Sequence, residues 1–549
     1  MATAQFSLRA LLLPILLLSP AATARSWDYI IVGSGPAGLV LSDRLSATGK
    51  STLLLEAGVA STYASGGREG PSWLRDSNEP LSRFDVPGFF GAFLAHPDGH
   101  QCPDIPFPAG CVLGGGSAVN SALWFLPPGG DLPWVDEEEG EAVAKARKKI
   151  PGTTNPSMDG KMWFPESFDI LGKMMRSLGW SEVDANKEMD RKDRCFARAS
   201  FGNTDGERGG PLTSYFLAAE KRPNFEIVYG ARVERVLRTA GKVVGLEFVR
   251  DRKRETVNLA EDGKAILSAG VFGSAKILWQ SGIGTRDQLE IIKAVKGDDM
   301  IPETEWIDLP VGYNLQDHPA TYVVFKYPGV GTAYNYSGAY ENPIPEDAQN
   351  YLQHRAGPLA SSNARISMWH EIKGSDGVVR TLQWNGRTGT AGNFTGPDLL
   401  LLTNYLTHGQ TTRGRIGLTP GNLNHKILES PYLITKEDVD TVIQSFQEVL
   451  EGVKNVEGLE LLLPDLATTT IDEFIRNYSL PRGSSHWIGS AAMGSVVDYE
   501  TKVLGMENLY VVDASILTGA TTSNPMGAIV VMAERAAELL TQETWGCDL

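Results

Sequence analysis

The chain is short of cysteine, histidine, positive charge and long apolar runs. Its 549 residues include 4 cysteines and 8 histidines, and none of these are spaced like the ligands of a metal site, so we expect no metal. After the N-terminus no run reaches the roughly 20 apolar residues of a membrane helix, so we expect no membrane span. Acidic residues outnumber basic ones by 66 to 50, a net charge of −16, which disfavours a nucleic-acid partner.

The N-terminus has the order of a secretory signal. Arg9 precedes an apolar run over residues 11–18, and small residues follow around Ala22 to Ala24. The apolar run is too short to span a bilayer. We therefore predict a signal peptide over residues 1–24 and a secreted protein, with an uncleaved anchor or a frayed tail as the alternatives.

Two other features agree with export. Three Asn-x-Ser/Thr tripeptides, at Asn335, Asn393 and Asn477, are candidate glycosylation sites, so the chain would be a glycoprotein. A disulfide between Cys102 and Cys111 would suit an exported chain, although spacing alone establishes no pairing.

A strand, a glycine turn and a helix follow the signal directly. Residues 27–32 form a short apolar run, residues 33–38 read Gly-Ser-Gly-Pro-Ala-Gly, and a helical pattern continues to residue 45. A second apolar run over residues 51–55 completes a βαβ unit of the doubly wound type. This order predicts a dinucleotide-binding turn, with a purely structural turn as the alternative.

Each glycine of the turn has its own role in such a site. Gly33 permits the tight turn, Gly35 lets the backbone approach a pyrophosphate, and Gly38 allows close packing of helix on strand. Glu56 lies at the end of the second strand, where a carboxylate accepts hydrogen bonds from an adenosine ribose.

A second glycine cluster follows at residues 114–120, Gly-Gly-Gly-Ser-Ala-Val-Asn. Its backbone is free to pass beneath an extended cofactor, although taken alone it could be a bulged loop. Further strand-like runs occur at residues 225–228, 243–249, 265–267 and 509–512, and residues 399–406 lie in a long segment with alternating patterns.

Taken with the first turn, several phrases resemble the glucose-methanol-choline (GMC) oxidoreductase family in the family's order. They are residues 114–120, 270–284, 309–319 and 508–515. Among subfamilies, residues 84–88, 374–377, 413–417 and 485–487 are most similar to the flavodehydrogenase domain of fungal cellobiose dehydrogenases.

The resemblance implies an α/β fold with a discontinuous Rossmann-like FAD-binding domain and a second, α+β substrate domain built on an antiparallel sheet. We assign residues 26–125, 211–320 and 483–549 to the first domain, and residues 126–210 and 321–482 to the second. FAD would be bound non-covalently, because residues 117–120 lack the histidine that tethers flavin in some members. The implied cofactor contacts, beyond Gly33, Gly35, Gly38 and Glu56, are Gly114, Gly115, Asn120, Val233, Asp513, Ala514, Asn524, Pro525 and Met526.

Removal of hydride from an alcohol carbon requires a base for the hydroxyl proton and a group that holds the oxygen. A histidine beside a tryptophan, as at His486, is by itself more often a satisfied core residue. The resemblance places His486 on the family's catalytic histidine and Asn524 on its partner. Asn524 and Pro525 also predict a helix start, with Asn524 as the N-cap of a helix over residues 525–540.

These features predict an FAD-dependent oxidoreductase that oxidises a CH–OH group, in an alcohol or a sugar hemiacetal, and passes electrons to oxygen or a quinone-like acceptor. The alternatives are a flavin-containing lyase similar to hydroxynitrile lyases, an alcohol oxidase that tailors a secondary metabolite, and a non-enzymatic flavoprotein. Residues 91–96 lack the carboxylates and aromatic platform expected of a cellobiose site, and Ser485 replaces an asparagine, so we do not expect cellobiose itself.

Overall fold

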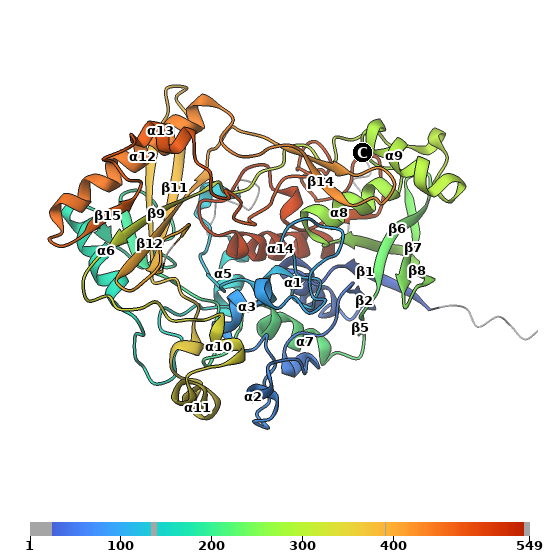
Figure 1. Cartoon of the computed structure of the whole chain (residues 1–549). Helices are drawn as coiled ribbons and strands as arrows, with labels where there is room; N and C mark the ends of the chain where they lie inside the picture. Colours follow the sequence, from blue (N-terminus) through green and yellow to red (C-terminus); the bar gives the residue numbers. More distant parts are fainter. Residues whose placement is uncertain (1–24, 133–139, 390, 543–549) are drawn as a thin grey trace, which may run out of the picture.

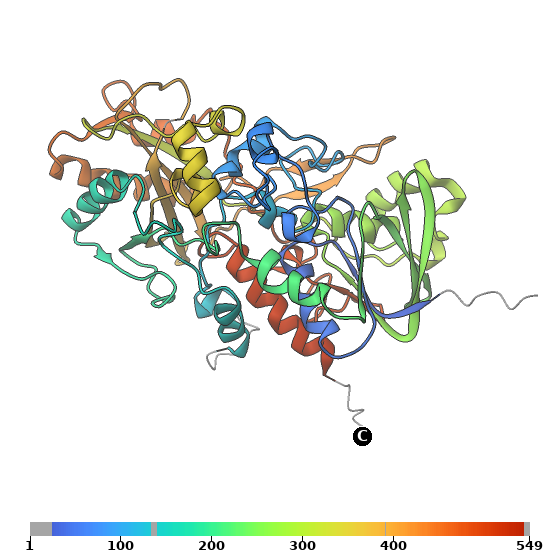
Figure 2. The ribbon, with the colours of Figure 1, turned by 90° about the horizontal axis from the view of Figure 1, so that it is seen from below.

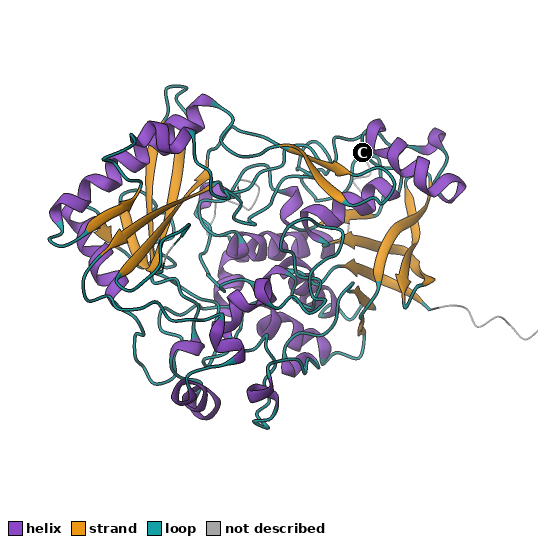
Figure 3. Ribbon diagram, viewed as in Figure 1, coloured by secondary structure: helices purple, strands orange, loops and turns teal. Residues whose placement is uncertain are grey.

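The structure is a computed structural model, and it describes residues 25–132, 140–389 and 391–542. Two groups of strands lie at opposite ends of the molecule, with helices between them (Figure 1, Figure 3). The predicted signal peptide lies outside the described residues, as does Cys547.

The first sheet contains the predicted βαβ unit. Its central parallel strands are β5 (Phe225–Val228), β2 (Thr52–Leu55), β1 (Ser26–Val32) and β8 (Lys253–Leu267). Antiparallel β7 (Lys242–Arg250) and β6 (Arg232–Thr239) extend it, and β16 (Leu509–Val511) pairs in parallel with the end of β8. Helix α1 (Pro36–Ser46) makes the crossover from β1 to β2. Segments far apart in the sequence therefore form one Rossmann-like sheet.

The second sheet is almost entirely antiparallel. Its strand order is β15 (Glu460–Leu463), β9 (Ala320–Lys326), β12 (Leu399–His408), β11 (Val379–Thr388), β10 (Ile366–Lys373), β4 (Cys195–Arg198) and β3 (Ser181–Glu182). The predicted fold class, a Rossmann-like unit with a second unit on an antiparallel sheet, is confirmed.

The two faces of the second sheet differ in composition because side chains alternate along each strand. One face is covered by helices α6 (Glu166–Ser177) and α12 (Lys436–Leu450) and packs Phe196, Leu382 and Trp384 into a buried core. The opposite face carries the polar residues Gln383 and Asn385. That polar face takes part in the site described below.

Helix α14 (Met526–Thr541) lies between the two sheets, as the views in Figure 1 and Figure 2 agree. It packs against α1 and against α5 (Glu141–Lys149). Glu534 on α14 forms a bidentate ion pair with Arg44 and accepts a hydrogen bond from Tyr215. These contacts hold the N-terminus of α14 in place relative to the first sheet.

Two segments that we assigned to the substrate domain contribute apolar side chains to the core of the first sheet. The hairpin of β13 (Arg415–Leu418) and β14 (His425–Glu429) packs its Ile416 and Leu418 into this core. Ala142 and Ala146 of α5 join it as well. The domain boundaries themselves stay a prediction.

The other helices are α2 (Ser72–Arg75), α3 (Ala92–Ala95), α4 (Gly116–Val119), α7 (Leu217–Glu220), α8 (Gly270–Gln280), α9 (Arg286–Lys296), α10 (Gly338–Glu341), α11 (Pro345–His354) and α13 (Ile471–Arg476). Cys102 and Cys111 form a disulfide. Within the described ranges no helix is both long and apolar enough to cross a membrane.

Candidate active site

The two glycine-rich segments of the sequence meet in space. The Gly114 N–H donates to the Ser34 carbonyl at 3.0 Å, so the second segment lies directly on the first turn. A Cβ on Gly115 would come within 3.3 Å of the Gly35 Cα. Because both residues are glycines, no side chain lies at this contact, and a cofactor could pass close to both segments.

The three glycines of the first turn meet different surroundings. Gly33 has φ +93°, and a Cβ there would lie 2.6 Å from the Ser268 carbonyl oxygen. A Cβ on Gly38 would lie 2.0 Å from the Gly33 carbonyl oxygen. At Gly35 the nearest such atom is 3.8 Å away. Gly33 and Gly38 are thus required by the fold itself, whereas Gly35 leaves space where a pyrophosphate would approach α1.

Glu56 lies at the end of β2 and is almost fully buried. Its carboxylate accepts hydrogen bonds from the N–H and hydroxyl of Ser34 and from the N–H of Gly58. Burial raises the pKa of Glu56, while these hydrogen bonds and Arg232 oppose the rise. A carboxylate has about four lone-pair positions, so acceptor capacity remains for a ribose hydroxyl. Val233 lies close by on β6, because the Ala231 N–H donates to the Glu56 carbonyl.

Asp513 follows β16 in the chain, and its side chain is hydrogen bonded to the start of α8. Its carboxylate accepts hydrogen bonds from the Gly270 N–H, the Ser274 hydroxyl and the Ser515 N–H. The next residue, Ala514, accepts from the Gly489 N–H at 3.2 Å, three residues after His486. The predicted cofactor residues Asp513 and Ala514 therefore connect the first sheet to the loop that carries His486.

Asn120 and Met526 lie side by side, since the Asn120 side-chain amide is 3.7 Å from the Met526 sulfur. Arg208, which sequence reasoning missed, binds this segment through the carbonyls of Ser117 and Asn120 and the Asn120 side chain. Arg208 is buried, and burial lowers its pKa to about 10. Nothing in the sequence distinguishes this arginine from a surface one.

These observations fit an extended dinucleotide such as FAD. Gly35 and Gly115 form a cradle that a side chain would fill, Glu56 lies at one end of it, and the N-terminus of α14 lies near the other beside Asn120. A helix N-terminus presents unpaired N–H groups and positive potential to an anionic group.

His486 and Asn524 are in direct contact. Their Nε2 and Nδ2 atoms lie 3.1 Å apart. The Asn524 Oδ1 accepts from the Gln383 side chain at 2.9 Å, so the amide NH2 of Asn524 is the group turned toward His486. This result corrects the expectation that Asn524 caps the helix: α14 begins at Met526, and the Asn524 side chain bonds across to the second sheet instead.

His318 contacts His486 on its other ring nitrogen, and sequence reasoning did not place it in the site. The two Nδ1 atoms lie 3.0 Å apart, so one of them carries the shared proton. The Asn524 amide nitrogen can only donate, so His486 Nε2 accepts from it and the proton of neutral His486 is on Nδ1. His318 Nδ1 therefore accepts the proton of His486 Nδ1, and the lone pair of His486 Nε2 points to the Asn524 amide.

Both histidines are kept neutral by their surroundings. Burial lowers the pKa of His318 far below its ordinary value, and His486 and His408 lower it further. Burial also lowers the pKa of His486, while the Asp317 carboxylate opposes that shift. A neutral imidazole with a free Nε2 is the form that accepts a proton.

Asp317 fixes the turn before His486. This fully buried carboxylate accepts the backbone N–H groups of Ser484, Ser485 and His486, together with the hydroxyl of Tyr432. Ser485 has φ +62°, a strained conformation for a residue with a side chain. Asp317 and His318 lie in the phrase over residues 309–319, so the signal for both was present in the sequence.

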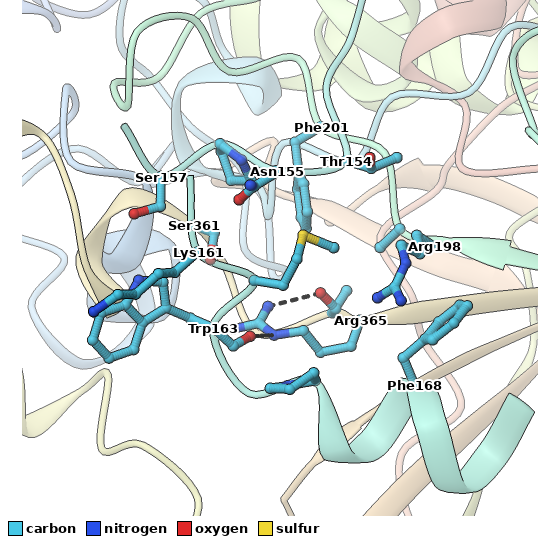
Figure 4. A pocket seen from close by; sticks show the side chains of 15 residues that line it. Thr154, Asn155, Ser157, Lys161, Trp163, Phe168, Arg198, Phe201, Ser361 and Arg365 are labelled. Atoms are coloured by element: carbon cyan, nitrogen blue, oxygen red, sulfur yellow. Dashed lines mark hydrogen bonds between the residues drawn. The ribbon is translucent and has the colours of Figure 1, made fainter. Parts of the chain in front are cut away.

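A separate pocket lies beside β4, away from the glycine turns (Figure 4). It holds about 400 Å³ of empty space, its open mouth included. Its labelled lining residues are Thr154, Asn155, Ser157, Lys161, Trp163, Phe168, Arg198, Phe201, Ser361 and Arg365. None of them belongs to the predicted catalytic or cofactor set.

Comparison with known proteins points to one family. The family model described as GMC oxidoreductase matches residues 27–320, and a second GMC oxidoreductase model matches residues 410–533. The chain is 25% identical to "Alcohol dehydrogenase [acceptor]" of Pseudomonas putida, over 94% of this chain and 96% of that one. It is 26% identical to "Oxygen-dependent choline dehydrogenase" of Vibrio vulnificus, over 94% of each chain.

A solved structure of formate oxidase has the same fold. Its TM-score is 0.72 at 18% identity, and the match covers 94% of this chain and 99% of that one.

Proposed function

Since this chain belongs to the GMC oxidoreductase family, it is an FAD-dependent enzyme that acts on CH–OH donors, and we propose that His486 and Asn524 perform the chemistry. The observation that carries this assignment is the 3.1 Å contact between His486 Nε2 and the Asn524 amide. A substrate hydroxyl placed between them would meet a proton acceptor and a hydrogen-bond donor at once.

Bound FAD supplies the hydride acceptor, and this chain supplies the proton chemistry. His486 Nε2 takes the hydroxyl proton as the hydride leaves the carbon. Asn524 donates from Nδ2 to the substrate oxygen and holds it while negative charge develops. His318 accepts from His486 Nδ1, which keeps the neutral imidazole in the required tautomer and holds the ring in the same orientation after it takes the proton.

The N-terminus of α14 contributes through its position. Asn524 lies two residues before this 16-residue helix, so the unpaired N–H groups of the helix lie close to the proposed reaction centre. Their positive potential would stabilise an anionic flavin ring. Residues Asn120, Pro525 and Met526 would line the same end of the cofactor.

The experiment that tests this proposal is anaerobic mixing of the purified protein with sugars, aryl alcohols and aliphatic alcohols while the flavin absorbance is followed. Loss of that absorbance with one class supports the oxidoreductase and identifies the donor. The lyase alternative predicts a flavin that stays oxidised during turnover. The relatives named above are dehydrogenases, so nothing in them favours the lyase.

For the substrate we propose a small alcohol or an alcohol of secondary metabolism rather than cellobiose. The phrases that resemble cellobiose dehydrogenases support kinship with that subfamily. The run over residues 91–96 does not support its sugar site, since Ala92 and Phe93 are buried and Leu94 is an exposed aliphatic side chain. Admitting air or a quinone to the reduced protein distinguishes the two expected acceptors.

We also propose that the protein is secreted, glycosylated and holds FAD non-covalently. Asn335, Asn393 and Asn477 are all exposed, which supports glycosylation. The segment over residues 117–120 offers no histidine for a flavin linkage. Recovery of the chain from culture medium with a mass that falls on treatment with a glycosidase tests the first two proposals. Release of free FAD on acid precipitation tests the third.

A further inference from the structure

Arg387 lies on the polar face of the second sheet. It is four residues along β11 from Gln383, so the two side chains share a face. On β12, Tyr405 is the partner of Gln383 and therefore lies on this face, as does Thr403 two residues away. Tyr322 on β9 is the partner of Thr403, so it lies on this face too. All three side chains, of Arg387, Tyr405 and Tyr322, are partly exposed.

This cluster is connected to the catalytic residues. The Tyr405 and His486 ring centres lie 5.9 Å apart, and Gln383 hydrogen bonds to Asn524. The Arg387 guanidinium lies near the phenols of Tyr405 and Tyr322. Burial raises the pKa of Tyr405 to about 12, so its hydroxyl stays protonated and able to donate.

Arg387 lacks the acidic partner that Arg380 and Arg355 have. Arg208 and Arg482 also lack one, but they donate to backbone carbonyls, whereas the Arg387 guanidinium has no hydrogen-bond acceptor among the described residues. Arg380 binds Asp376 and Asp438, and Arg355 binds Glu79 and Glu207. In the part of the chain that the structure describes, Arg387 interacts with the two phenols and with no carboxylate. A partly desolvated guanidinium without a counter-ion is unfavourable, and an acidic ligand would offset that cost.

We propose that Arg387, Tyr405 and Tyr322 form an anion subsite, so that the substrate is an alcohol with a carboxylate or similar acidic group at its far end. This inference rests on the proposed roles of His486 and Asn524. Four residues of extended strand span about 13 Å. An acidic group bound by Arg387 would therefore lie within about that distance of the reacting carbon, and a separation of about 10 Å falls in this range.

The test compares 4′-(hydroxymethyl)biphenyl-4-carboxylate with its methyl ester, since the two differ only in charge at about the required distance. We expect wild type to favour the acid in kcat/KM for flavin reduction, and Arg387→Gln to reduce the acid-to-ester ratio about 10- to 100-fold. Arg387→Lys, which keeps the charge, should retain part of the preference. Arg198→Ala is the matched control, because Arg198 lies on the opposite face of the same sheet, and it should leave the ratio unchanged.

A second readout separates this subsite from the proposed reaction. Biphenyl-4-carboxylate, which cannot react, is titrated into the FAD-loaded protein by calorimetry. Binding to wild type that weakens about 10-fold or more in Arg387→Gln supports the subsite even if no alcohol reduces the flavin. Equal kcat/KM for acid and ester in wild type, or equal binding by wild type and Arg387→Gln, would overturn the proposal.

Discussion

The Nδ1 atoms of His318 and His486 lie 3.0 Å apart, and His318 is completely enclosed by protein. Because the Asn524 amide donates to Nε2 of His486, the shared proton is on Nδ1 of His486. The arrangement resembles the orienting pair of a catalytic triad, except that a neutral imidazole replaces the carboxylate. It orients the base without adding a negative charge beside it.

His318→Leu should lower kcat about 10- to 100-fold, since His486 then loses the acceptor that selects its tautomer. His318→Asn places an oxygen near the former Nδ1 position and should recover part of the loss. Steady-state kinetics at several pH values, with FAD content measured alongside, check the prediction. Equal losses in both variants with reduced FAD content would show that His318 only supports the fold.

His486→Ala should reduce the rate of flavin reduction about 100- to 10,000-fold, the usual contribution of a positioned base. FAD retention should change far less, because the predicted cofactor contacts lie on other segments. Stopped-flow reduction and flavin absorbance per protein measure the two quantities. Parallel loss of cofactor and rate would assign His486 a structural role.

The acid limb of activity should lie below pH 6.5. The base works only when neutral, and burial lowers the pKa of His486 from that ordinary value. Activity should therefore persist as pH falls to 6.5 and decline only as pH passes through the lower pKa of the folded enzyme. A kcat/KM profile from pH 4 to 8 measures the midpoint, and a midpoint above 6.5 would contradict the prediction.

Asp317→Asn should both destabilise the protein and move that midpoint. A buried amide cannot accept all the hydrogen bonds now made to the carboxylate, so we expect a loss of about 2–4 kcal/mol in the free energy of unfolding. Asp317 also raises the pKa of His486, so its neutralisation should shift the acid limb to lower pH. Denaturant unfolding and the pH profile test the two effects. A shift toward higher pH would refute the electrostatic part.

Gly35→Ala and Gly38→Ala should fail in different ways. The Gly38 substitution puts a methyl group 2.0 Å from the Gly33 carbonyl oxygen, so we expect a loss of about 3 kcal/mol or more in stability. Gly35 has φ −61° and open space at its Cβ position, so alanine should fold there yet weaken FAD binding. Unfolding of the FAD-free proteins and FAD titration distinguish the two. A folded Gly38→Ala protein would show that the turn can relax.

The local sequence pattern was sufficient to predict the strand, turn and helix that open the Rossmann-like sheet. The apolar run over residues 27–32, the glycine turn and the helical stretch became β1, the turn and α1, because each is determined by neighbours in the chain. The fold class and the cofactor followed from the order of the motifs. The core that the β13–β14 hairpin joins is not contained in its local pattern, because the same apolar side chains could pack against either sheet.

The sequence by itself therefore determined the strand–turn–helix unit, the glycine positions and the pair His486 and Asn524 as candidates. Only the tertiary structure decided which nitrogen of His486 is free, since that depends on His318, 168 residues away in the chain. It also decided that the Asn524 amide turns to Gln383 rather than capping α14, and that Arg387 has no carboxylate beside it among the residues that the structure describes. Hydrogen-bond direction and charge pairing are set by contacts between distant segments, and a sequence pattern does not contain those contacts.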